Sequence, residues 1–418
     1  MEQQGASWRE RPHEIWIAML ALGVALSPTN TKIAGAAWLL VCLAGLFLFF
    51  RKAAVQDDER AAVAKAWLIA CAVAAALATG LALRWPDGPD TLHAEFRLLL
   101  AAAAVVSLVR HLPPAERWRA LTLPAVALAC VAALVVIALG SDRHSVPSNP
   151  IPWAVAMSFL DCILLPVCLT SQRMGRLRVT YWLCVAAAIG AILASQSRGA
   201  FGILMWTIWL LVAVGAKNQT RVSKRAMGVA SLLATAVLAV SVYLPNDPLR
   251  LRLGWNEVAT ALNEGKYNSS MGARMYLWRL GWRGFGESPL VGIGGKERLK
   301  RIKSVGADLP PAERIKFQEV RNVGHVHNQY LHAAMDGGLV GLASTLAVLA
   351  GLGAAAWRLR RFDPVASRQM QGVLFMHATA GLTNVNMAHN YYAIMLSLSV
   401  TLILVGAGQR AGPGASSP

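Results

Sequence analysis

The sequence predicts an all-α integral membrane protein with about twelve transmembrane helices and one large loop outside the membrane. Of its 418 residues, 56% are hydrophobic, which is more than a soluble chain of this length buries. A helix needs about 20 consecutive apolar residues to cross a bilayer, and the chain offers many such runs. Lys and Arg gather in the short segments between the runs, where membrane proteins place the charges that set topology.

The spans are predicted in chain order from these apolar runs. The first run follows a polar stretch and has no small-residue cleavage site near Ser27 and Pro28, so it is a retained span rather than a cleaved signal. At residues 197–199 the chain either separates two helices or interrupts one. The spans are expected near residues 14–28, 33–50, 65–83, 96–111, 118–140, 152–171, 180–195, 199–216, 226–244, 330–356, 370–388 and 391–407.

Positive charge orients these spans. With the N-terminus in the cytoplasm, every cytoplasmic segment carries Lys or Arg. The short outside segments hold few: Lys32, Arg84, Arg97, Arg143 and Arg198. Both termini are therefore predicted on the cytoplasmic side, and residues 245–329 are predicted outside.

The loop at 245–329 departs from this charge rule. It carries fourteen Lys and Arg against eight Asp and Glu, an excess that indicates anion binding. Within it, Trp278 and Trp282 lie four positions apart, as do Arg279 and Arg283. This spacing predicts an amphipathic helix over residues 271–286. A second, interfacial helix is predicted over residues 249–263.

The composition also argues against several classes of protein. The formal net charge is +18, but its placement between spans sets topology and does not indicate nucleic-acid binding. All six cysteines lie in apolar runs, so neither a disulfide framework nor a cysteine metal site is expected. The sequence has no P-loop, which argues against ATP hydrolysis. The outside turn at residues 28–32 lacks the acidic ligands of metal-dependent lipid-linked sugar transferases.

Two histidines stand where the loop meets the next span, in the stretch His325-Val326-His327-Asn328. A histidine accepts a proton near neutral pH, so this stretch is a candidate for general-base chemistry. Two other interpretations stay open. One is a polar cap on a helix, and the other is a zinc-binding His-x-His pair, for which no acidic or cysteine partner lies nearby in the sequence.

Arginines supply the candidates for anion binding. Arg198 lies between two apolar runs, where it is costly unless it snorkels or meets an anion. Arg274 begins the aromatic and basic helix; a guanidinium group grips phosphate oxygens with two parallel hydrogen bonds. The alternative for Arg274 is contact with lipid headgroups. The basic run from Lys296 to Lys303 is interpreted as a patch that faces solvent or lipid headgroups.

The remaining polar candidates are weaker. Asp161 and His377 lie within spans, where ionisable groups are either functional or paired between helices. The last outside turn holds a group of polar residues that would help to line a cleft: Asn384, Asn386, His389 and Asn390.

Together these residues resemble the O-antigen ligase family, within the O-antigen ligase/polymerase superfamily of bacterial lipopolysaccharide assembly. Three stretches carry the resemblance. They are Ser197-Arg198-Gly199; Arg274 with Trp278 and Trp282, continuing into Ser288-Pro289-Leu290 and Gly292-Ile293-Gly294; and His327-Asn328 with Leu331, continuing into Gly337-Gly338-Leu339. The plan of about twelve spans with one large late loop is similar as well.

The resemblance implies a glycosyltransferase that moves a glycan from undecaprenyl pyrophosphate to a sugar of lipid A-core, without metal or cofactor and with inversion. By the same resemblance His327 is the general base, and Arg198 and Arg274 hold the pyrophosphate. Further pyrophosphate contacts are expected from Arg279, Arg283 and Arg321. The supporting residues are His325, which is also the reserve base, Asn328, Tyr330, His389 and Asn390.

The resemblance also implies a place in the cell. The protein would lie in the bacterial inner membrane with its loop in the periplasm, in contact with donor, acceptor and membrane lipids. Its parts are then residues 1–244 with nine spans, the loop domain 245–329, residues 330–410 with three spans, and a disordered tail, 411–418.

Other functions stay open at this point. O-antigen polymerases tend to have two comparable periplasmic loops, whereas the other outside loops here, residues 84–95 and 141–151, are short. Protein O-oligosaccharyltransferases usually carry a longer soluble C-terminal part. A multi-span transporter would be expected to show paired halves and to use Asp161 and His377.

Overall fold

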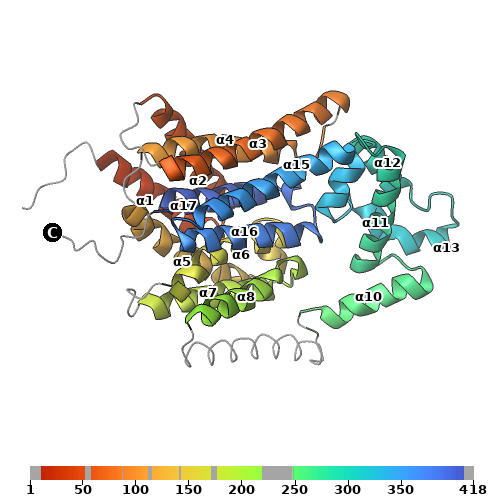
Figure 1. The fold of residues 1–418 in the computed structure, drawn as a ribbon. Helices are drawn as coiled ribbons and strands as arrows, with labels where there is room; N and C mark the ends of the chain where they lie inside the picture. Colours follow the sequence, from red (N-terminus) through yellow and green to blue (C-terminus); the bar gives the residue numbers. More distant parts are fainter. Residues whose placement is uncertain are drawn as a thin grey trace, which may run out of the picture.

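The computed structural model is helical throughout the residues that it describes, which are 11–51, 58–86, 88–111, 115–140, 143–170, 177–218, 247 and 249–408. Most helices form an elongated bundle, and a smaller group, α10 (Leu251–Glu264) to α13 (Pro311–Arg314), caps one end of it (Figure 1). The bundle helices are α1 (Arg11–Leu26), α2 (Thr31–Phe49), α3 (Asp58–Arg84), α4 (Leu92–His111), α5 (Ala115–Leu139), α6 (Pro150–Thr170), α7 (Leu177–Ala194), α8 (Gly202–Asn218), α15 (Gln329–Leu359), α16 (Pro364–Gly381) and α17 (Asn390–Gly406).

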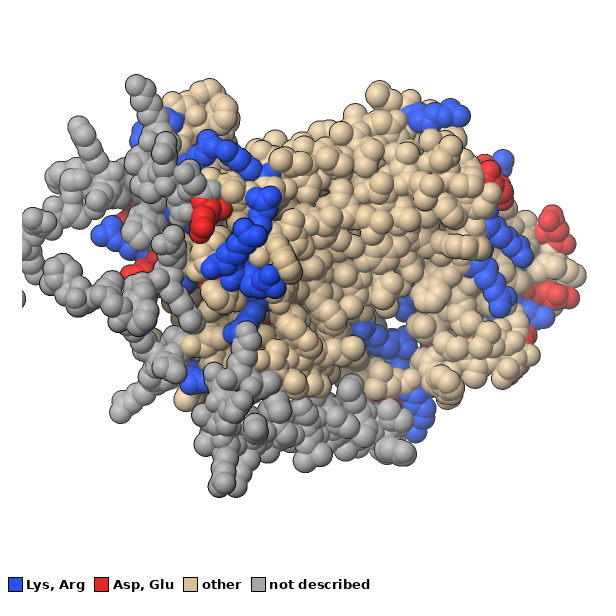
Figure 2. Space-filling view, in the orientation of Figure 1, with Lys and Arg blue, Asp and Glu red and all other residues tan. Residues whose placement is uncertain are grey.

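The surface of the bundle suits a membrane. Among the described residues, α2 to α7 and α15 are long and apolar enough to cross one, and α1, α8 and α17 are shorter apolar helices. Large side chains such as Phe47, Leu128 and Leu183 point outward and are 58%, 61% and 65% exposed. Figure 2 shows a broad band of uncharged surface between two regions where Lys and Arg gather. The chain is therefore a multi-pass membrane protein.

Most predicted spans coincide with a helix. The break at residues 197–199 separates α7 from α8 through a short 3-10 turn, η2 (Arg198–Ala200). The span predicted at 370–388 is shifted, because α16 begins at Pro364 and ends at Gly381. Its early start follows from Asp363, whose Oδ1 accepts hydrogen bonds from the first backbone N–H groups of the helix. The span predicted at 226–244 lies outside the described residues.

The core of the bundle is formed by α6 and α17, whose side chains are almost all buried. Helix α17 packs against α2, α4 and α6, and α6 packs against α16 and α7. Hydrogen bonds fix the ends of these inner helices. The Tyr391 hydroxyl donates to the carbonyl of Ser27 at 3.1 Å, and Trp153 Nε1 donates to the carbonyl of Pro28 at 3.0 Å. These two bonds tie the first turns of α17 and α6 to the turn that follows α1.

Residues 249–328, called here the loop segment, form the cap. Its helices are α10 (Leu251–Glu264), α11 (Ser270–Glu287), α12 (Gly295–Ser304), α13 (Pro311–Arg314) and α14 (Gln318–Asn322). Leu277, Ile302, Val320 and Val326 bury themselves in a small core with Met335 of α15. Helices α10 and α11 lie where the two amphipathic helices are predicted. The loop segment is therefore a folded unit packed on the start of α15.

A backbone seam joins the loop segment to α15. Helix α15 is broken at Gly338, which has φ 59° and ψ −146°, so backbone groups near the break lose their helical partners. Residues 288–294 supply new partners. The N–H groups of Ile293 and Gly294 donate to the carbonyls of Met335 and Asp336 at 2.9 and 3.0 Å, and the N–H of Leu339 donates back at 2.7 Å.

Glycines allow the two backbones of the seam to touch. A Cβ added at Gly292 would lie 2.3 Å from the carbonyl carbon of Asp336, and one added at Gly338 would lie 2.3 Å from that of Leu290. Gly292 also has a positive φ of 65°. The glycine stretch at 292–294 therefore serves the contact between loop segment and helix.

Replacing Gly338 by Ala should lower the melting temperature of the purified protein in detergent. The left-handed backbone alone costs a non-glycine residue about 1–3 kcal/mol, and the added methyl group overlaps the facing chain. Gly286→Ala is the matched control, because a Cβ there meets nothing within 4 Å. Equal melting temperatures for the two variants would show that the backbone contact at Gly338 does not contribute to the stability of the fold.

Candidate active site

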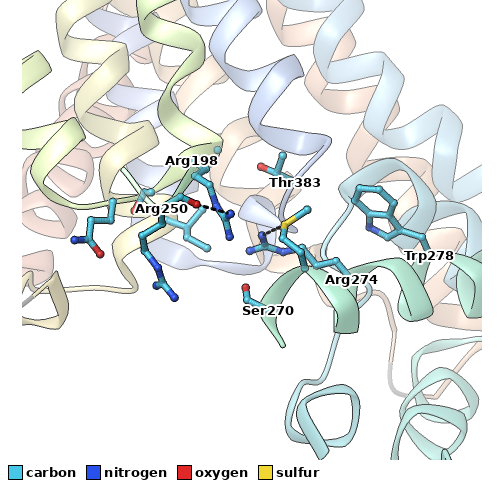
Figure 3. A pocket seen from close by; sticks show the side chains of 11 residues that line it. Arg198, Arg250, Ser270, Arg274, Trp278 and Thr383 are labelled. Carbon is cyan, nitrogen blue, oxygen red and sulfur yellow. Dashed lines mark hydrogen bonds between the residues drawn. The ribbon is translucent and has the colours of Figure 1, made fainter. Parts of the chain in front are cut away.

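A cavity of about 200 Å³ lies between the loop segment and the bundle. Figure 3 shows the guanidinium groups of Arg198 and Arg274 turned toward each other across it, one from the bundle and one from α11. Its wall is formed by Ile151, Gln196, Ser197, Arg198, Gly199, Arg250, Ser270, Met271, Arg274, Trp278 and Thr383. Two positive groups facing one small space make it suited to an anion with several oxygens.

The turn between α7 and α8 positions Arg198. The Ser197 hydroxyl donates to the carbonyl of Pro150 at 3.0 Å, which ties the turn to the start of α6. Nη1 of Arg198 donates to the carbonyl of Arg250 at 3.1 Å, and Nη2 lies 4.0 Å from Oε2 of Glu257. A Cβ at Gly254 would lie 1.9 Å from Nη1, so a side chain there would push the guanidinium group of Arg198 out of this position. Burial lowers the pKa of Arg198, and the guanidinium group stays protonated at neutral pH.

Helix α11 positions Arg274 in its second turn. The helix begins at Ser270, and the hydroxyl of Ser269 accepts a hydrogen bond from the N–H of Gly272 at 3.2 Å. Nη1 of Arg274 lies 3.3 Å from the sulfur of Met271, on the same wall. Glu257 of α10 also accepts from the N–H of Met271 at 2.9 Å, so one carboxylate braces the two helices that face Arg198.

Arg250 is a cavity residue that the sequence analysis missed. Its backbone is left-handed, with φ 55°, and this conformation aims its carbonyl at Arg198. In Figure 3 its side chain extends away from the other two guanidinium groups. The sequence held a weak signal, since Arg250 lies in the first turn of the helix predicted over residues 249–263, where the helix dipole favours acidic residues.

A cluster of histidines stands beside the cavity. The rings of His325 and His327 lie 4.4 Å apart between centroids, and His389 lies 6.4 Å from His325. His327 has φ 51°, a conformation that a residue with a side chain rarely adopts. Strain of this kind persists only where the surroundings enforce it and concentrates at functional sites.

The contacts of His327 define which nitrogen is free. Nδ1 lies 3.2 Å from Oδ1 of Asn384, and Nδ2 of Asn384 donates to Oδ1 of Asn386 at 2.9 Å. With the amides in this orientation Asn384 offers His327 an acceptor, which favours the tautomer that carries its proton on Nδ1. Nε2 of His327 therefore keeps its lone pair. Asn384 comes from the turn between α16 and α17, far from His327 in the sequence.

The histidines are held in their neutral form. Burial, and next the charge of Arg274, lower the pKa of His327 from its ordinary 6.5 to about 4. Burial, and next the neighbouring His327, lower the pKa of His325 to about 2. Burial also lowers the pKa of His389. A neutral His327 with a free Nε2 can accept a proton at neutral pH.

Three predicted arginines lie away from the cavity wall. Nη1 of Arg279 donates to the Tyr267 hydroxyl at 3.0 Å inside the loop segment. Arg321 donates from Nη1 and Nη2 to two backbone carbonyls, at 3.1 Å each. Arg283 is exposed on α11. In this structure Arg279 and Arg321 brace the loop segment, and the facing guanidinium groups of the cavity are those of Arg198 and Arg274.

Of the predicted supporting residues, some hold the backbone near the site and others do not contact it. Asn328 caps α15, because its Oδ1 accepts a backbone N–H of the first turn at 3.0 Å. The Tyr330 hydroxyl donates to a carbonyl of α16 at 2.7 Å. Both hold the end of the histidine stretch in place. His389 joins the histidine cluster, and Asn390 is exposed at the start of α17.

One further group of polar residues lies outside the cavity. Among the described residues, Asp90, His332 and Asp336 are spaced to hold a metal ion, with ligand atoms within 4.8 Å of one another. Arg298 already supplies a cation there. Its Nε lies 2.8 and 3.0 Å from the two oxygens of Asp336, and its Nη2 lies 2.6 Å from Oδ2 of Asp90. This ion cluster ties α12 to α15 and to the turn before α4.

The fold and the cavity together define a class: a multi-pass helical membrane protein with a cationic cavity and neutral histidines at one end of its bundle. Residues 183–346 match the family model Wzy_C, whose description is O-Antigen ligase. Over these residues the chain is similar to the O-antigen ligase family, which agrees with the resemblance seen in the sequence. The matched region contains Arg198, Arg274 and His327. Among curated proteins, none matches the chain.

Replacing Arg274 by Gln should raise the pKa of His327, because it removes a positive charge that disfavours protonation. Burial persists, so the pKa should stay below 6.5. The measurement is a ¹⁵N-histidine NMR titration, with the resonance assigned through His327→Gln. Lys300→Gln is the control, since Lys300 is 79% exposed. An unchanged His327 pKa in Arg274→Gln would mean that the two side chains are not coupled.

Proposed function

We propose that the protein is an O-antigen ligase, which transfers a glycan from undecaprenyl pyrophosphate to a sugar of lipid A-core on the periplasmic face of the inner membrane. The observation that carries the proposal is the pairing of two facing arginines with a neutral histidine whose Nε2 is free. The family match at residues 183–346 supports it.

The chemistry requires a leaving group, a nucleophile and a base. The acceptor hydroxyl oxygen attacks the anomeric carbon and forms the new glycosidic bond. The bond from that carbon to the pyrophosphate oxygen breaks, and its electron pair leaves with the pyrophosphate. The hydroxyl proton passes to Nε2 of His327. A single displacement of this kind inverts the anomeric centre.

Arg198 and Arg274 stabilise the charge that develops on the leaving group. Pyrophosphate gains negative charge as the bond breaks, so donors already aimed at its oxygens lower the barrier. Both side chains are partly buried, which strengthens their interaction with the anion. Burial, and next the positive charge of Arg274, keep His327 neutral, so it can accept the hydroxyl proton.

His327→Ala should lower turnover by about 10²–10⁴-fold, the usual contribution of a general base.

Arg274→Lys should lower turnover by about 10²-fold, because an ammonium group cannot reproduce the two parallel hydrogen bonds of a guanidinium group. The assay is restoration of the lipopolysaccharide ladder in a bacterium that lacks its own O-antigen ligase and has matching core and donor. Lys300→Gln, exposed on α12, is the control that should restore a full ladder.

The outcomes of this complementation separate the candidate functions. A ladder from wild type and Lys300→Gln but not from the two site variants supports the ligase and both assigned roles. A full ladder from His327→Ala would remove the base assignment. No ladder from well-expressed wild type would favour an O-antigen polymerase or another member of the superfamily.

The pH dependence of the purified enzyme should reflect the lowered pKa of His327. The base must be neutral, so kcat/KM should stay level from pH 7 down to about pH 5 and fall below it. Bound pyrophosphate adds negative charge, which raises the His327 pKa, so kcat should fall at a higher pH than kcat/KM. A decline of kcat/KM centred on pH 6.5 would contradict a buried base.

Folding must be monitored in the same pH series. His327 has a folded pKa of about 4 against an ordinary 6.5. The unfolded chain therefore binds more protons in this range, and stability falls as pH falls from about 6.5 toward 4. Melting temperatures at each pH separate this loss from protonation of the base in the folded enzyme.

A further inference from the structure

A second hollow opens on the loop segment and shares no lining residue with the arginine cavity. It is an open groove of about 460 Å³. Its wall includes Gly88 and Asp90 from the turn before α4, Gly295, Lys296 and Leu299 from α12, and Gly324. Arg298 closes its floor. Nothing in the reaction described so far uses it.

The histidine pair connects the groove to the cavity. Gly324 of the groove directly precedes His325, whose ring lies 4.4 Å from that of His327. Burial is the largest cause of the lowered pKa of both histidines; next to it the charge of Arg274, in the cavity, acts on His327, and the charge of Arg298, on the groove, contributes least at His325. His325 therefore stands beside the groove, and His327 stands beside the cavity.

The groove offers a fixed hydrogen-bond acceptor. Oδ2 of Asp90 lies 2.6 Å from Nη2 of Arg298 and 3.4 Å from Nε2 of His332. Asp90 is 42% exposed, so part of its carboxylate remains open to the groove. Burial raises its pKa, but the bond to His332 and the charge of Arg298 outweigh this and lower it to about 2. The carboxylate is thus ionised and held in one place.

The rest of the lining suits a sugar. Lys296 is exposed and supplies a donor, and Leu299 supplies an apolar contact for the C–H face of a ring. Gly88, Gly295 and Gly324 have no side chains, so the face of a sugar ring can approach the backbone there closely. Recognition sites of this kind combine a few placed polar groups with uncharged surface.

We propose that this groove binds the acceptor saccharide. The acceptor's hydroxyl groups donate to Asp90, and Lys296 donates to its oxygens. The reacting hydroxyl then extends past His325 to His327, while the donor pyrophosphate occupies the arginine cavity. The inference rests on the proposed ligase reaction, and it assigns the acceptor to a surface distinct from the donor site.

Gly324→Trp tests the groove directly. A Cβ at Gly324 meets nothing within 4 Å, so a side chain can start there without a backbone clash, and the melting temperature of the variant checks that the fold is kept. In a transfer assay with purified lipid A-core and glycan-bearing undecaprenyl pyrophosphate, the acceptor KM should rise by about tenfold, or ~1.4 kcal/mol. The donor KM and the kcat at saturating acceptor should remain as in wild type. Lys296→Gln should raise the acceptor KM in the same direction by a smaller factor.

The control is Gly286→Trp, which also enters open space but lies at the end of α11 outside the groove. It should leave all three constants unchanged. Wild-type acceptor KM in both Gly324→Trp and Lys296→Gln would overturn the assignment of the groove while leaving the ligase reaction intact. A fall in kcat with unchanged acceptor KM would also overturn it, because that pattern means displacement of His325. Absence of transfer by wild type would instead overturn the ligase proposal and the inference with it.

Discussion

The contact between the loop segment and the broken start of α15 is the constraint on which the site depends. Two sets of interactions form this contact. The glycine seam lets the two backbones touch at Gly292 and Gly338, and the Arg298 cluster joins α12 to Asp336 and Asp90. A buried ion cluster adds little net stability, but losing one partner is costly, so it fixes geometry more than it adds stability. Because α11 and the histidine stretch both extend from this contact, it sets the position of Arg274 relative to His327.

Charge is divided between the two hollows in a way that suits two substrates. The cavity takes positive charge from Arg198 and Arg274, and its nearest histidine stays neutral because of that charge and of burial. The groove places an ionised carboxylate, Asp90, over an arginine that is already paired. An anion is therefore attracted to the cavity, and a hydroxyl-rich molecule is better matched to the groove. The histidine pair lies where the two would meet.

Much of this could be predicted from the sequence, for identifiable reasons. Apolar runs, basic loops and the four-residue spacing of Trp278 and Trp282 predict helices, and Arg198 and Arg274 are visible because arginine is unusual beside apolar runs. Asn384 was only a weak candidate, because its role depends on a turn brought to His327 by tertiary packing. Arg298 was interpreted as part of a patch that faces solvent or lipid headgroups, yet it is 3% exposed between two carboxylates. Its partners lie in separate elements, and no local pattern indicates them.

The most direct test of the account is a structure of the protein with undecaprenyl pyrophosphate bound. The account predicts pyrophosphate oxygens within hydrogen-bond distance of both Arg198 and Arg274, with Nε2 of His327 open toward the position of the anomeric carbon. Pyrophosphate bound elsewhere, for example on the exposed Arg283 or against Lys296, would contradict it. So would a complex in which Nε2 of His327 is buried against protein and cannot reach an acceptor hydroxyl.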